Sequence, residues 1–577
     1  MSAFFSSRSV DMARPKSSIS SSLRRYLPFI ALAVVLWLTC FSALNNSDLI
    51  DSVDEGYFSS IARQMVETGN WLIPRVGSEV FLGKPPLLYW SQAFFIWLTG
   101  PSLLAVRLPS GLAAALTALV LWWWGARNGR ARAGLLAALF YVLCPLTLCL
   151  ANLAMMDCLL TLWLTLAAVG WIDAYKGDRR GYLLWAIAAG LVCMTKGLIG
   201  FLLPLGAFVI WLLARRDTRE LRRVPWLAVV PLFLVLTLPW HLAAWRSLGG
   251  AFVQEYIVRE QIERFLGRGY NYTSPFWYYL AELPFAMFPW VVFVPAACWR
   301  ALRDGWRSPR SEMNCAAAMW ALWALVIVIF FSFSRTKLPQ YILAALPALC
   351  MLVAMRLETA WQTRRTLSKG EAVGLGLTGF ILGALLVIVF LIGWQLRAQS
   401  GAPLLGGASL GGWLERERES SLLTLLTPQC LWLGTIILLG TIVMLLSWKA
   451  AQRVATASIL TATILAFIVL HSARPVWSQN QIEPMNELGR RTLPALQRGE
   501  SLVIYEANSP TPYSLHFQLG HPDQIKIVIL RHELPAVLDK LQHGYVLAQR
   551  KAVFDPSPIE PRQEASAGSW ILWRFDR

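Results

Sequence analysis

The sequence predicts an all-α polytopic membrane protein that ends in a small soluble α/β domain. The chain has 577 residues, 56% of them apolar, and its mean hydropathy is +0.49. Apolar runs of about 17–25 residues recur along most of the chain, and this is the length that a membrane-spanning helix needs. Roughly the last hundred residues are more polar and alternate short apolar runs with turn residues, which is typical of a folded soluble domain.

The distribution of basic residues gives the orientation of the spans. The formal net charge is +18, but the Lys and Arg residues lie in short loops between apolar segments, so we exclude a nucleic-acid partner. This is the positive-inside distribution of membrane proteins. Seven basic clusters hold half of the 52 Lys and Arg residues, and they begin at Arg8, Arg127, Lys176, Arg215, Arg300, Arg356 and Lys449.

The number of spans follows from keeping all seven clusters in the cytoplasm. Hydropathy alone gives fourteen apolar segments, and the charges agree only if one of them does not cross. The weakest is 85–99, which is short and opens with two prolines, so we interpret it as a juxtamembrane or re-entrant helix. We therefore expect about thirteen transmembrane helices, with the N-terminus in the cytoplasm and the C-terminus outside. The first apolar segment, 26–44, is interpreted as an uncleaved signal-anchor.

Two domains are expected. We expect residues 1–473 to form the transmembrane domain, with juxtamembrane loops on the outer face at 46–100 and 245–280, and residues 474–577 to form the soluble domain. In the soluble domain we predict strands at 502–505, 525–530, 545–549 and 570–573 and a helix at 534–541. The nine cysteines lie in or beside apolar segments without a C-x-x-C pair, so neither a disulfide framework nor a thiolate zinc site is expected.

Three carboxylates on the predicted outer face are candidates for catalysis: Asp54, Glu55 and Asp157. Asp54 and Glu55 follow the first span, and Asp157 stands alone among apolar residues at a helix end. A carboxylate at the lipid–water boundary can act as a base, orient a hydroxyl or hold an amino sugar. An ionisable residue at membrane depth is a functional candidate by default. The other role open to each is a helix cap, where an acid satisfies free backbone N–H groups.

Cationic side chains on the same face are candidates for binding an anion. Lys84 and Lys337 each precede a proline at an expected helix start, in Lys84-Pro85-Pro86 and Lys337-Leu338-Pro339. A cation beside a helix N-terminus forms an anion site, and Tyr341 would add a hydroxyl donor. The natural anion at this depth is a lipid phosphate, although snorkelling toward headgroups explains any single cation equally well. The other candidates are Arg259, Arg264, Arg268 and Arg335.

The sequence lacks the motifs of nucleotide-dependent enzymes. It contains neither G-x-x-x-x-G-K-[ST] nor a dinucleotide-binding fingerprint, and no Ser–His pair is evident among its six histidines. A nucleotide-sugar donor is therefore not supported. No cofactor is required by the sequence, and metal ligands stay unknown. A divalent ion beside Asp54 and Glu55 is compatible with the residues, but no His/Cys cluster demands one.

These motifs, in this order, resemble the C-type, multi-span glycosyltransferases that use polyprenyl-phosphate sugars, the protein O-mannosyltransferase superfamily. The motifs are Asp54-Glu55, Lys84-Pro85-Pro86-Leu87-Leu88-Tyr89-Trp90, Asp157 and Lys337-Leu338-Pro339-Gln340-Tyr341. Within the superfamily, the Lys-Pro-Pro run, the thirteen spans and the C-terminal domain are most similar to the bacterial lipid A 4-amino-4-deoxy-L-arabinose transferases. The resemblance covers most of the chain in architecture and these points in motif.

The resemblance implies the C-type glycosyltransferase fold and a transfer of aminoarabinose from undecaprenyl phosphate to a lipid A phosphate. The reaction would take place at the periplasmic face of the bacterial inner membrane, and masking the phosphate with a cationic sugar would lower the affinity of polymyxin-type peptides. By the family pattern, Asp54 is the catalytic carboxylate and Lys84 holds the donor phosphate. The expected partners are the sugar donor, lipid A and membrane lipids, and the expected state is a monomer.

The chemistry of the acceptor leaves the role of the carboxylates open. A phosphate monoester is already anionic near neutral pH, so a strong base is less necessary than it is for a hydroxyl acceptor. Asp54, Glu55 or Asp157 would then pair with the sugar ammonium or a developing oxocarbenium. Stabilisation of the leaving phosphate by Lys84 and an arginine would supply a larger share of catalysis.

Two other functions are weighed. A second enzyme keeps the fold and changes the acceptor: a polyprenyl-phosphate mannosyl- or arabinosyltransferase that acts on protein or another glycan. The non-enzyme alternative is a transporter. Transporters usually place charges at the bilayer midplane and show inverted repeats, whereas the charges here cluster at the ends of spans on one face.

Overall fold

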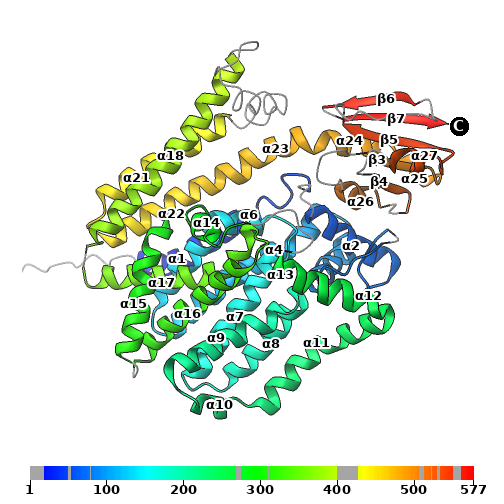
Figure 1. Ribbon diagram of the computed structural model, residues 1–577. Coiled ribbons are helices and arrows are strands. Elements are labelled where there is room, and N and C mark those ends of the chain that lie inside the picture. Colours follow the sequence, from blue (N-terminus) through cyan, green and yellow to red (C-terminus); the bar gives the residue numbers. More distant parts are fainter. Residues whose placement is uncertain are drawn as a thin grey trace, which may run out of the picture.

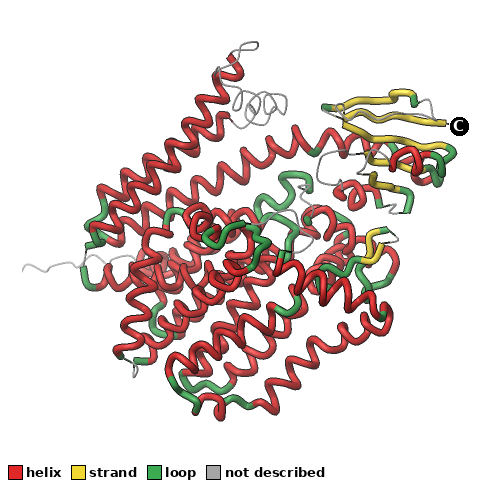
Figure 2. Tube along the Cα trace, viewed as in Figure 1, coloured by secondary structure: helices red, strands yellow, loops and turns green. Residues whose placement is uncertain are grey.

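A computed structural model describes residues 18–49, 54–77, 79–267, 274–308, 311–364, 366–398, 427–505, 513–520, 523–528, 533–549, 561–568 and 570–576. Figure 1 shows a large helical body and, beside it, a small sheet domain that holds the C-terminus. Figure 2 shows that the strands gather in that domain, apart from one short hairpin in the body. The functional residues predicted from the sequence lie almost entirely in the helical body.

The helices of the body follow the order of the chain. The first group is α1 (Ser18–Cys40), α2 (Glu55–Thr68), α3 (Leu87–Thr99), α4 (Leu103–Arg127), α5 (Ala131–Leu143), α6 (Pro145–Ala151), α7 (Asp157–Tyr175), α8 (Arg180–Lys196), α9 (Ile199–Arg215), α10 (Arg219–Arg223) and α11 (Trp226–Leu248). The second group is α12 (Gly250–Phe252), the π-helical η1 (Val253–Glu263), α13 (Arg264–Leu266), α14 (Tyr278–Ala286), η2 (Trp290–Phe293), α15 (Val294–Arg307), α16 (Glu312–Phe333), η3 (Pro339–Ala345), α17 (Leu346–Gln362), α18 (Lys369–Ala398), α21 (Thr427–Leu446) and α22 (Ala451–Ile468). A hairpin of β1 (Arg75–Val76) and β2 (Glu79–Val80) lies between α2 and α3.

The body is that of a multi-span membrane protein. Among the described residues, 8 helices are long and apolar enough to cross a membrane, or 10 if each of two bent helix pairs counts as one span. The bent pairs are α5 with α6, at 66°, and α14 with the segment Trp290–Arg307, at 119°. Two further apolar helices, Tyr26–Cys40 and Ile199–Arg215, are shorter. The segment 85–99 forms α3, a helix of 13 residues that is too short to span on its own.

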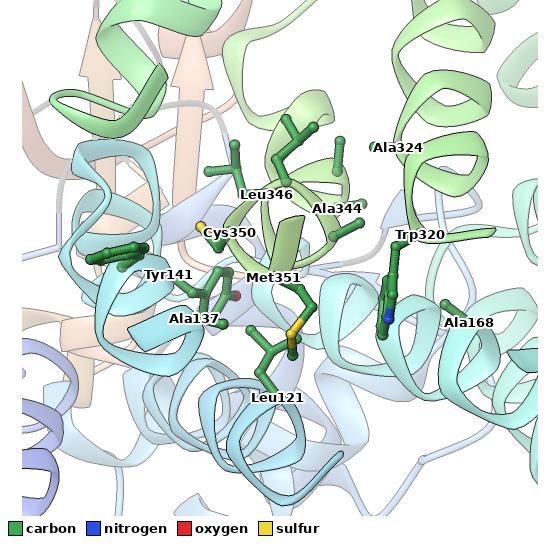
Figure 3. Packing of buried hydrophobic residues seen from close by; sticks show 14 of the residues in the cluster. Leu121, Ala137, Tyr141, Ala168, Trp320, Ala324, Ala344, Leu346, Cys350 and Met351 are labelled. Carbon is green, nitrogen blue, oxygen red and sulfur yellow. The ribbon is translucent and has the colours of Figure 1, made fainter. Parts of the chain in front are cut away.

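The core of the body lies around α7 and α17. In the apolar window of α7, 83% of residues are buried, and in that of η3 with α17 the share is 94%, whereas it is 22% for the peripheral α11. Figure 3 shows Cys350 and Met351 of α17 among side chains from other helices, including Leu121, Ala137 and Trp320. The central helices are therefore enclosed by protein, and the peripheral ones keep an apolar face for lipid.

Small residues allow the helices to approach closely. A Cβ atom on Gly125 of α4 would lie only 2.5 Å from the Cα atom of Gly134 in α5. Lipid tails are as apolar as leucine, so helices in a membrane associate through such close packing rather than through expulsion of water. Any larger residue at Gly125 would separate α4 from α5.

The C-terminal domain is built on a five-stranded mixed sheet. Its connecting helices are η4 (Val469–Ala473), α23 (Arg474–Gln481), α24 (Glu483–Arg491), α25 (Leu493–Gln497), α26 (Tyr513–Leu519) and α27 (Leu534–Leu538). Its strands are β3 (Ser501–Tyr505), β4 (Ile525–Val528), β5 (His543–Gln549), β6 (Arg562–Ala567) and β7 (Trp570–Asp576), in the order β4-β3-β5-β7-β6. β3 is parallel to β4 and β5, and β7 is antiparallel to β5 and β6.

The predicted strands and helix of this domain are confirmed at β3, β4, β5, β7 and α27. The prediction missed β6, whose sequence Arg-Gln-Glu-Ala-Ser-Ala has no apolar alternation. As the edge strand of the sheet, β6 leaves most of its side chains exposed. An exposed edge needs backbone pairing but few buried side chains, so hydropathy does not reveal it.

The sheet domain packs on α2 through α26. Ser60 of α2 donates a hydrogen bond to the carbonyl of Tyr513 at 2.9 Å, and Arg63 donates to the carbonyl of Phe517. The rings of Tyr57 and Tyr513 meet edge to face with centroids 4.4 Å apart. The C-terminal domain therefore braces the helix whose first turn carries the predicted catalytic carboxylates.

Candidate functional site

The first turn of α2 directs its two neighbouring carboxylates to different surroundings. The helix begins at Glu55, and Asp54 occupies the N-cap position without a side-chain cap hydrogen bond. Residues 100° apart on a helix face different directions, so the adjacent acids do not share one environment. Glu55 is completely buried, while Asp54 is partly exposed.

Glu55 forms a buried ion pair with Arg107 of α4. Arg107 donates from Nε to Oε1 at 2.8 Å and from Nη2 to Oε2 at 3.2 Å, and neither side chain has any solvent exposure. The backbone N–H of Ala154 also donates to Glu55 Oε1 at 2.8 Å. With both oxygens engaged and no solvent contact, Glu55 has the surroundings of a structural carboxylate.

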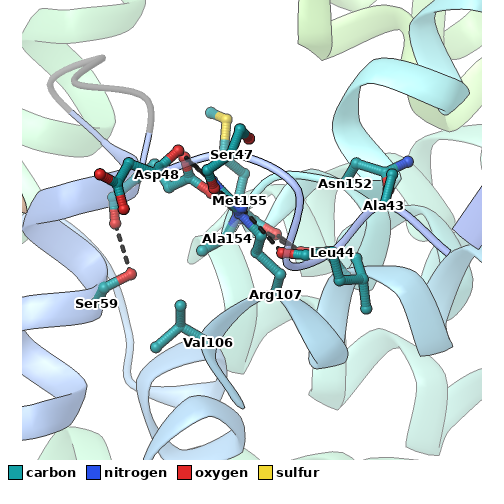
Figure 4. A network of polar contacts seen from close by, with 12 residues as sticks. Ala43, Leu44, Ser47, Asp48, Ser59, Val106, Arg107, Asn152, Ala154 and Met155 are labelled. Carbon is teal, nitrogen blue, oxygen red and sulfur yellow. Dashed lines mark hydrogen bonds and ion pairs between the residues drawn. The ribbon is translucent and has the colours of Figure 1, made fainter. Parts of the chain in front are cut away.

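Arg107 uses its remaining donors on the chain that follows the first span. It donates to the carbonyls of Leu44, Ser47 and Asp48 at 2.9, 2.6 and 2.7 Å. Figure 4 shows this network, in which Arg107 reaches the segment from Leu44 to Asp48 beside Ala154. An arginine inside an apolar span is a signal of function or of a buried polar contact, yet Arg107 is not among the candidates predicted from the sequence.

Asp54 lies in a field of opposing charges. Within the described residues its carboxylate has no hydrogen-bond or ion-pair partner, yet Arg264, Lys84 and Lys196 are all near enough to act on it. Burial and, next, the negative charge of Asp157 raise the pKa of Asp54, while the three cations oppose that rise. A carboxylate without a fixed partner, next to several cations, is available to a substrate.

Asp157 is held by Lys196, at the start of α7 and the end of α8. Lys196 Nζ donates to Asp157 Oδ1 at 2.9 Å, and their side chains are 7% and 4% exposed. The ammonium of Lys196 also lies 4.3 Å from the ring centroid of Tyr341, within cation–π distance. Asp157 therefore does not act alone, because its charge is coupled to Lys196.

Lys84 enters the site from the turn before α3. Pro85 and Pro86 precede the helix, where a missing N–H and a fixed φ are tolerated. Lys84 Nζ donates to Glu260 Oε2 of η1 at 2.8 Å and to the carbonyl of Gly83 at 2.7 Å. Burial lowers the pKa of Lys84 to about 8, although the Glu260 carboxylate opposes this, and the charges of Arg264 and Lys196 lower it further.

Glu260 joins Lys84 to Arg264 and Tyr341. Arg264 Nη1 donates to the same Glu260 oxygen at 2.9 Å, and its Nη2 approaches the Tyr341 hydroxyl at 3.4 Å. Two cations thus share one carboxylate oxygen, which leaves an excess of positive charge. Neither Glu260 nor Lys196 is among the candidate residues predicted from the sequence.

A cavity of about 310 Å³ lies against these side chains. Its polar lining includes Lys84, Lys196, Glu260, Arg264 and Tyr341. The hydroxyl of Thr336 is also part of the lining, is buried and has no hydrogen-bond partner within the described residues. Its other walls are apolar, with Leu198, Ile199, Leu202, Phe330 and Phe331 among them. The cavity therefore suits an anion attached to an apolar chain.

Three predicted cations lie outside this cavity. Lys337 donates to the carbonyls of Ser274, at 2.9 Å, and Ser334, and burial lowers its pKa. Arg335 is exposed, and Arg259 pairs with Glu255 at 2.8 Å in an exposed contact along one helix. Arg268 lies outside the described residues. The cavity thus brings together Lys84, Arg264 and Tyr341 from the predicted binding set.

Sequence comparisons place the chain among known enzymes. A family model described as dolichyl-phosphate-mannose-protein mannosyltransferase matches residues 83–243. An undecaprenyl phosphate-alpha-4-amino-4-deoxy-L-arabinose arabinosyl transferase from Erwinia tasmaniensis is 31% identical over 374 residues, which cover 62% of this chain and 66% of that protein. Its counterpart from Yersinia enterocolitica is 30% identical over 384 residues, covering 64% and 67%. The chain belongs to this arabinosyl transferase family. It spans about two thirds of the length of these curated relatives.

The fold of the chain is also that of a solved structure. The crystal structure of ArnT from Cupriavidus metallidurans bound to undecaprenyl phosphate superposes with a TM-score of 0.72. The match covers 96% of this chain and 98% of that one at 20% sequence identity. The similarity of architecture therefore includes the sheet domain, beyond the part of the chain that the family model matches.

Proposed function

We propose that this protein transfers 4-amino-4-deoxy-L-arabinose from undecaprenyl phosphate to a phosphate of lipid A, and so lowers sensitivity to polymyxin. The observation that carries the proposal is the cavity lined by Lys84, Arg264 and Lys196, three cations whose charges also act on Asp54. Relatives in the family are arabinosyl transferases of undecaprenyl phosphate-aminoarabinose by name. A polyprenyl phosphate has the chemistry that the cavity suits, namely an anion on an apolar chain.

The donor phosphate would bind where Lys84 and Arg264 now share Glu260. Both cations point at one carboxylate oxygen, so a phosphate oxygen can take up the same donors. The unpartnered hydroxyl of Thr336 supplies a further donor, and the polyprenyl chain follows the wall formed by Leu198, Leu202 and Phe330. Charge-assisted hydrogen bonds of this kind are stronger than neutral ones.

The reaction needs stabilisation of charge more than proton transfer. An oxygen of the acceptor phosphate attacks the anomeric carbon, and the bond from that carbon to undecaprenyl phosphate breaks with its electron pair on the leaving phosphate. Lys84 and Arg264 stabilise the negative charge that develops there. A dianionic acceptor needs no base, and a monoanionic one gives its proton to a carboxylate.

Asp54 is the carboxylate that we assign to the reaction. It is the one of the three candidates without a fixed partner in the described structure, since Glu55 is held by Arg107 and Asp157 by Lys196. Facing the sugar, it would pair with the amino group or with positive charge that develops at the anomeric carbon. Asp157 and Lys196 are assigned a positioning role, because Lys196 also contacts Tyr341.

We further propose thirteen spans in the bacterial inner membrane, with the site and residues 474–577 in the periplasm. Ten of the thirteen are the described helices and bent pairs that are long and apolar enough to cross a membrane. The other three are the two shorter apolar helices and α8. Arg127, Arg215 and Arg307 lie in the last turns of α4, α9 and α15, which this order of spans places on the cytoplasmic face, in keeping with the positive-inside rule. We propose that the protein is a monomer and that it binds both the donor and lipid A from the outer leaflet of this membrane.

Accessibility to a thiol reagent tests this topology. Single cysteines in place of Glu79 and Lys540, both exposed, should react with a membrane-impermeant maleimide in intact cells. A cysteine in place of Arg222, which is exposed in α10, should react only after permeabilisation. Each is compared with the unsubstituted protein, because Cys149 is also exposed. Labelling of Arg222→Cys from outside, or of Lys540→Cys only after lysis, would contradict thirteen spans.

Mass spectrometry of lipid A tests the function itself. Cells that make the aminoarabinose donor and express the protein should yield lipid A heavier by one aminoarabinose residue, and the purified protein should reproduce the shift with donor and lipid A. Cells that lack the protein should not. A shift by a different sugar would keep the enzyme class and exclude this substrate.

One observation supports a second candidate function, in which the acceptor is a protein or another glycan. The matched family model is described by transfer of mannose to protein, and the same site would serve a polyprenyl-phosphate mannosyl- or arabinosyltransferase for protein or glycan. Unmodified lipid A together with a sugar on periplasmic proteins would support that activity instead.

A further inference from the structure

A second cavity, of about 410 Å³, lies at the other end of the helices that form the candidate active site. It is bounded by α15, by the first turns of α16 and by the last turns of α17. α16 contributes Asn314 to this cavity and Phe331 to the first one. Seventeen residues of helix separate them, which is roughly 25 Å. That is close to the ~30 Å of a bilayer core, so the two cavities lie at opposite membrane faces.

Arginine dominates the polar part of this second cavity. Arg130, Arg300, Arg303 and Arg356 line it, and Asp304 is its only acidic lining residue among those described. Arg356 is occupied by Glu371, with bonds of 3.1 and 2.9 Å. Arg130 donates to Glu358 at 2.6 Å and to Thr359 at 2.9 Å. These two arginines are fixed by the fold.

Arg300 and Arg303 remain available to a ligand. Among the described residues, Arg300 has no ion-pair or hydrogen-bond partner. Within the described part of the chain, Arg303 pairs only with its neighbour Asp304, and the two side chains are 42% and 43% exposed, so that pair contributes little. They lie one helical turn apart on α15 and flank one face. Two adjacent guanidinium groups match the oxygens of a phosphate.

Apart from Asn314 and Thr359, the rest of the lining is apolar, and half of its apolar residues are alanines. Ala297, Ala301 and Ala317 belong to it, together with Leu352 and Met355. A free phosphate would fill the arginine rim and leave this floor uncovered. A molecule with an anionic head and an apolar body would cover both parts.

We propose that this cavity binds the phosphate group of an anionic glycerophospholipid in the leaflet opposite the active site. Basic pockets between membrane helices on the cytoplasmic side are suited to such headgroups. The phosphate is held by Arg300 and Arg303, and the glycerol backbone lies over Ala297 and Ala301. The proposal concerns a binding site away from the transfer reaction and does not depend on the sugar or acceptor.

Thermal unfolding of the purified full chain in detergent tests the site. Phosphatidylglycerol should raise the unfolding midpoint, phosphatidylcholine with the same acyl chains should raise it less, and inorganic phosphate at equal concentration should have no effect. The double variant Arg300→Gln/Arg303→Gln should bind phosphatidylglycerol about tenfold more weakly or worse, since two charge-assisted contacts are lost. Arg307→Gln on the same helix, outside the cavity, is the matched control.

A second variant separates loss of the site from loss of the fold. Ala301→Leu keeps every charge and fills the floor of the cavity, and it should also reduce the lipid-dependent shift. Native mass spectrometry of each variant reports bound phosphatidylglycerol directly. Equal retention of this lipid by wild type and the double variant would overturn the proposal. A shift produced by inorganic phosphate alone would replace the lipid with a free anion and overturn the lipid assignment.

Discussion

Replacement of Lys84 by alanine is expected to abolish most sugar transfer while the protein still inserts and folds. The side chain is the cation that the Pro85–Pro86 turn directs at the proposed phosphate position, where it now meets Glu260 at 2.8 Å. Loss of a charge-assisted phosphate contact should cost about 2–4 kcal/mol of transition-state stabilisation. This corresponds to a fall of about 30-fold to 1,000-fold in kcat/KM.

The pH dependence of kcat/KM gives an independent test of the role of Lys84. In the free enzyme the pKa of Lys84 is lowered to about 8, so its charge is present below that pH and is lost above it. We therefore expect kcat/KM to decline on the alkaline side near pH 8, because kcat/KM reports the free enzyme. Lys84→Arg should move that decline to higher pH, since a guanidinium stays charged.

The control for Lys84 is a cation on η1 that does not reach the cavity. Arg259 pairs with Glu255 in a solvent-exposed contact, so Arg259→Ala should change kcat/KM little. Turnover by purified Lys84→Ala close to that of the wild type would exclude its role at the donor phosphate. An equal loss in both variants would point to a general electrostatic effect of the outer face.

Asp54→Asn is expected to be as inactive as Asp54→Ala, with little change in stability. Asparagine keeps the size and caps a helix about as well as aspartate, so only the lost charge distinguishes it. Asp54 makes no cap hydrogen bond, which leaves little structural role to lose. The measurement is sugar transfer to lipid A, with the unfolding midpoint recorded for each variant.

Glu55→Gln provides the contrast. It removes the charge that neutralises Arg107 inside the protein, and breaking a buried ion pair in this way costs about 3–5 kcal/mol. We expect this variant to lose stability first and activity as a consequence. Neutral substitution of Asp54 should also reduce sugar transfer more than neutral substitution of Asp157 does. Full activity of Asp54→Asn would assign Asp54 to structure and direct attention to Asp157.

The acid side of the pH profile should report Asp54. Burial and the charge of Asp157 raise its pKa, so it becomes protonated, as pH falls, at a higher pH than an ordinary aspartate. If the ionised form is required, kcat/KM declines there, and Asp54→Asn removes that decline together with most of the rate.

The helices were largely predictable because their signals are local. Apolar runs mark the spans, and Lys84-Pro85-Pro86 marks the start of α3. Distances between residues far apart in sequence were not predictable. Lys84 meets Glu260 across 176 positions, and Arg107 meets Glu55 across 52. The motif Asp54-Glu55 predicted a site with two neighbouring carboxylates. Their surroundings differ because the two side chains leave the start of α2 in different directions.

Contacts between residues far apart in sequence also decide which of the predicted cations reach the cavity. Lys84 and Lys337 have similar sequence surroundings, each before a proline. Lys84 extends into the cavity, whereas Lys337 turns back to the carbonyls of Ser274 and Ser334. The pattern of residue types predicts that a helix starts at each place, but it does not predict which oxygens accept hydrogen bonds from the neighbouring lysine.

The network around Arg107 has a consequence for the rate of reaction. Arg107 ties Leu44, Ser47 and Asp48 to Glu55, so the chain leaving the first span and the start of α2 are fixed to α4. Asp54 directly precedes Glu55 at the start of α2. In the proposed reaction, the backbone that carries Asp54 would therefore be in place before substrate binds, and little energy would be spent on moving it.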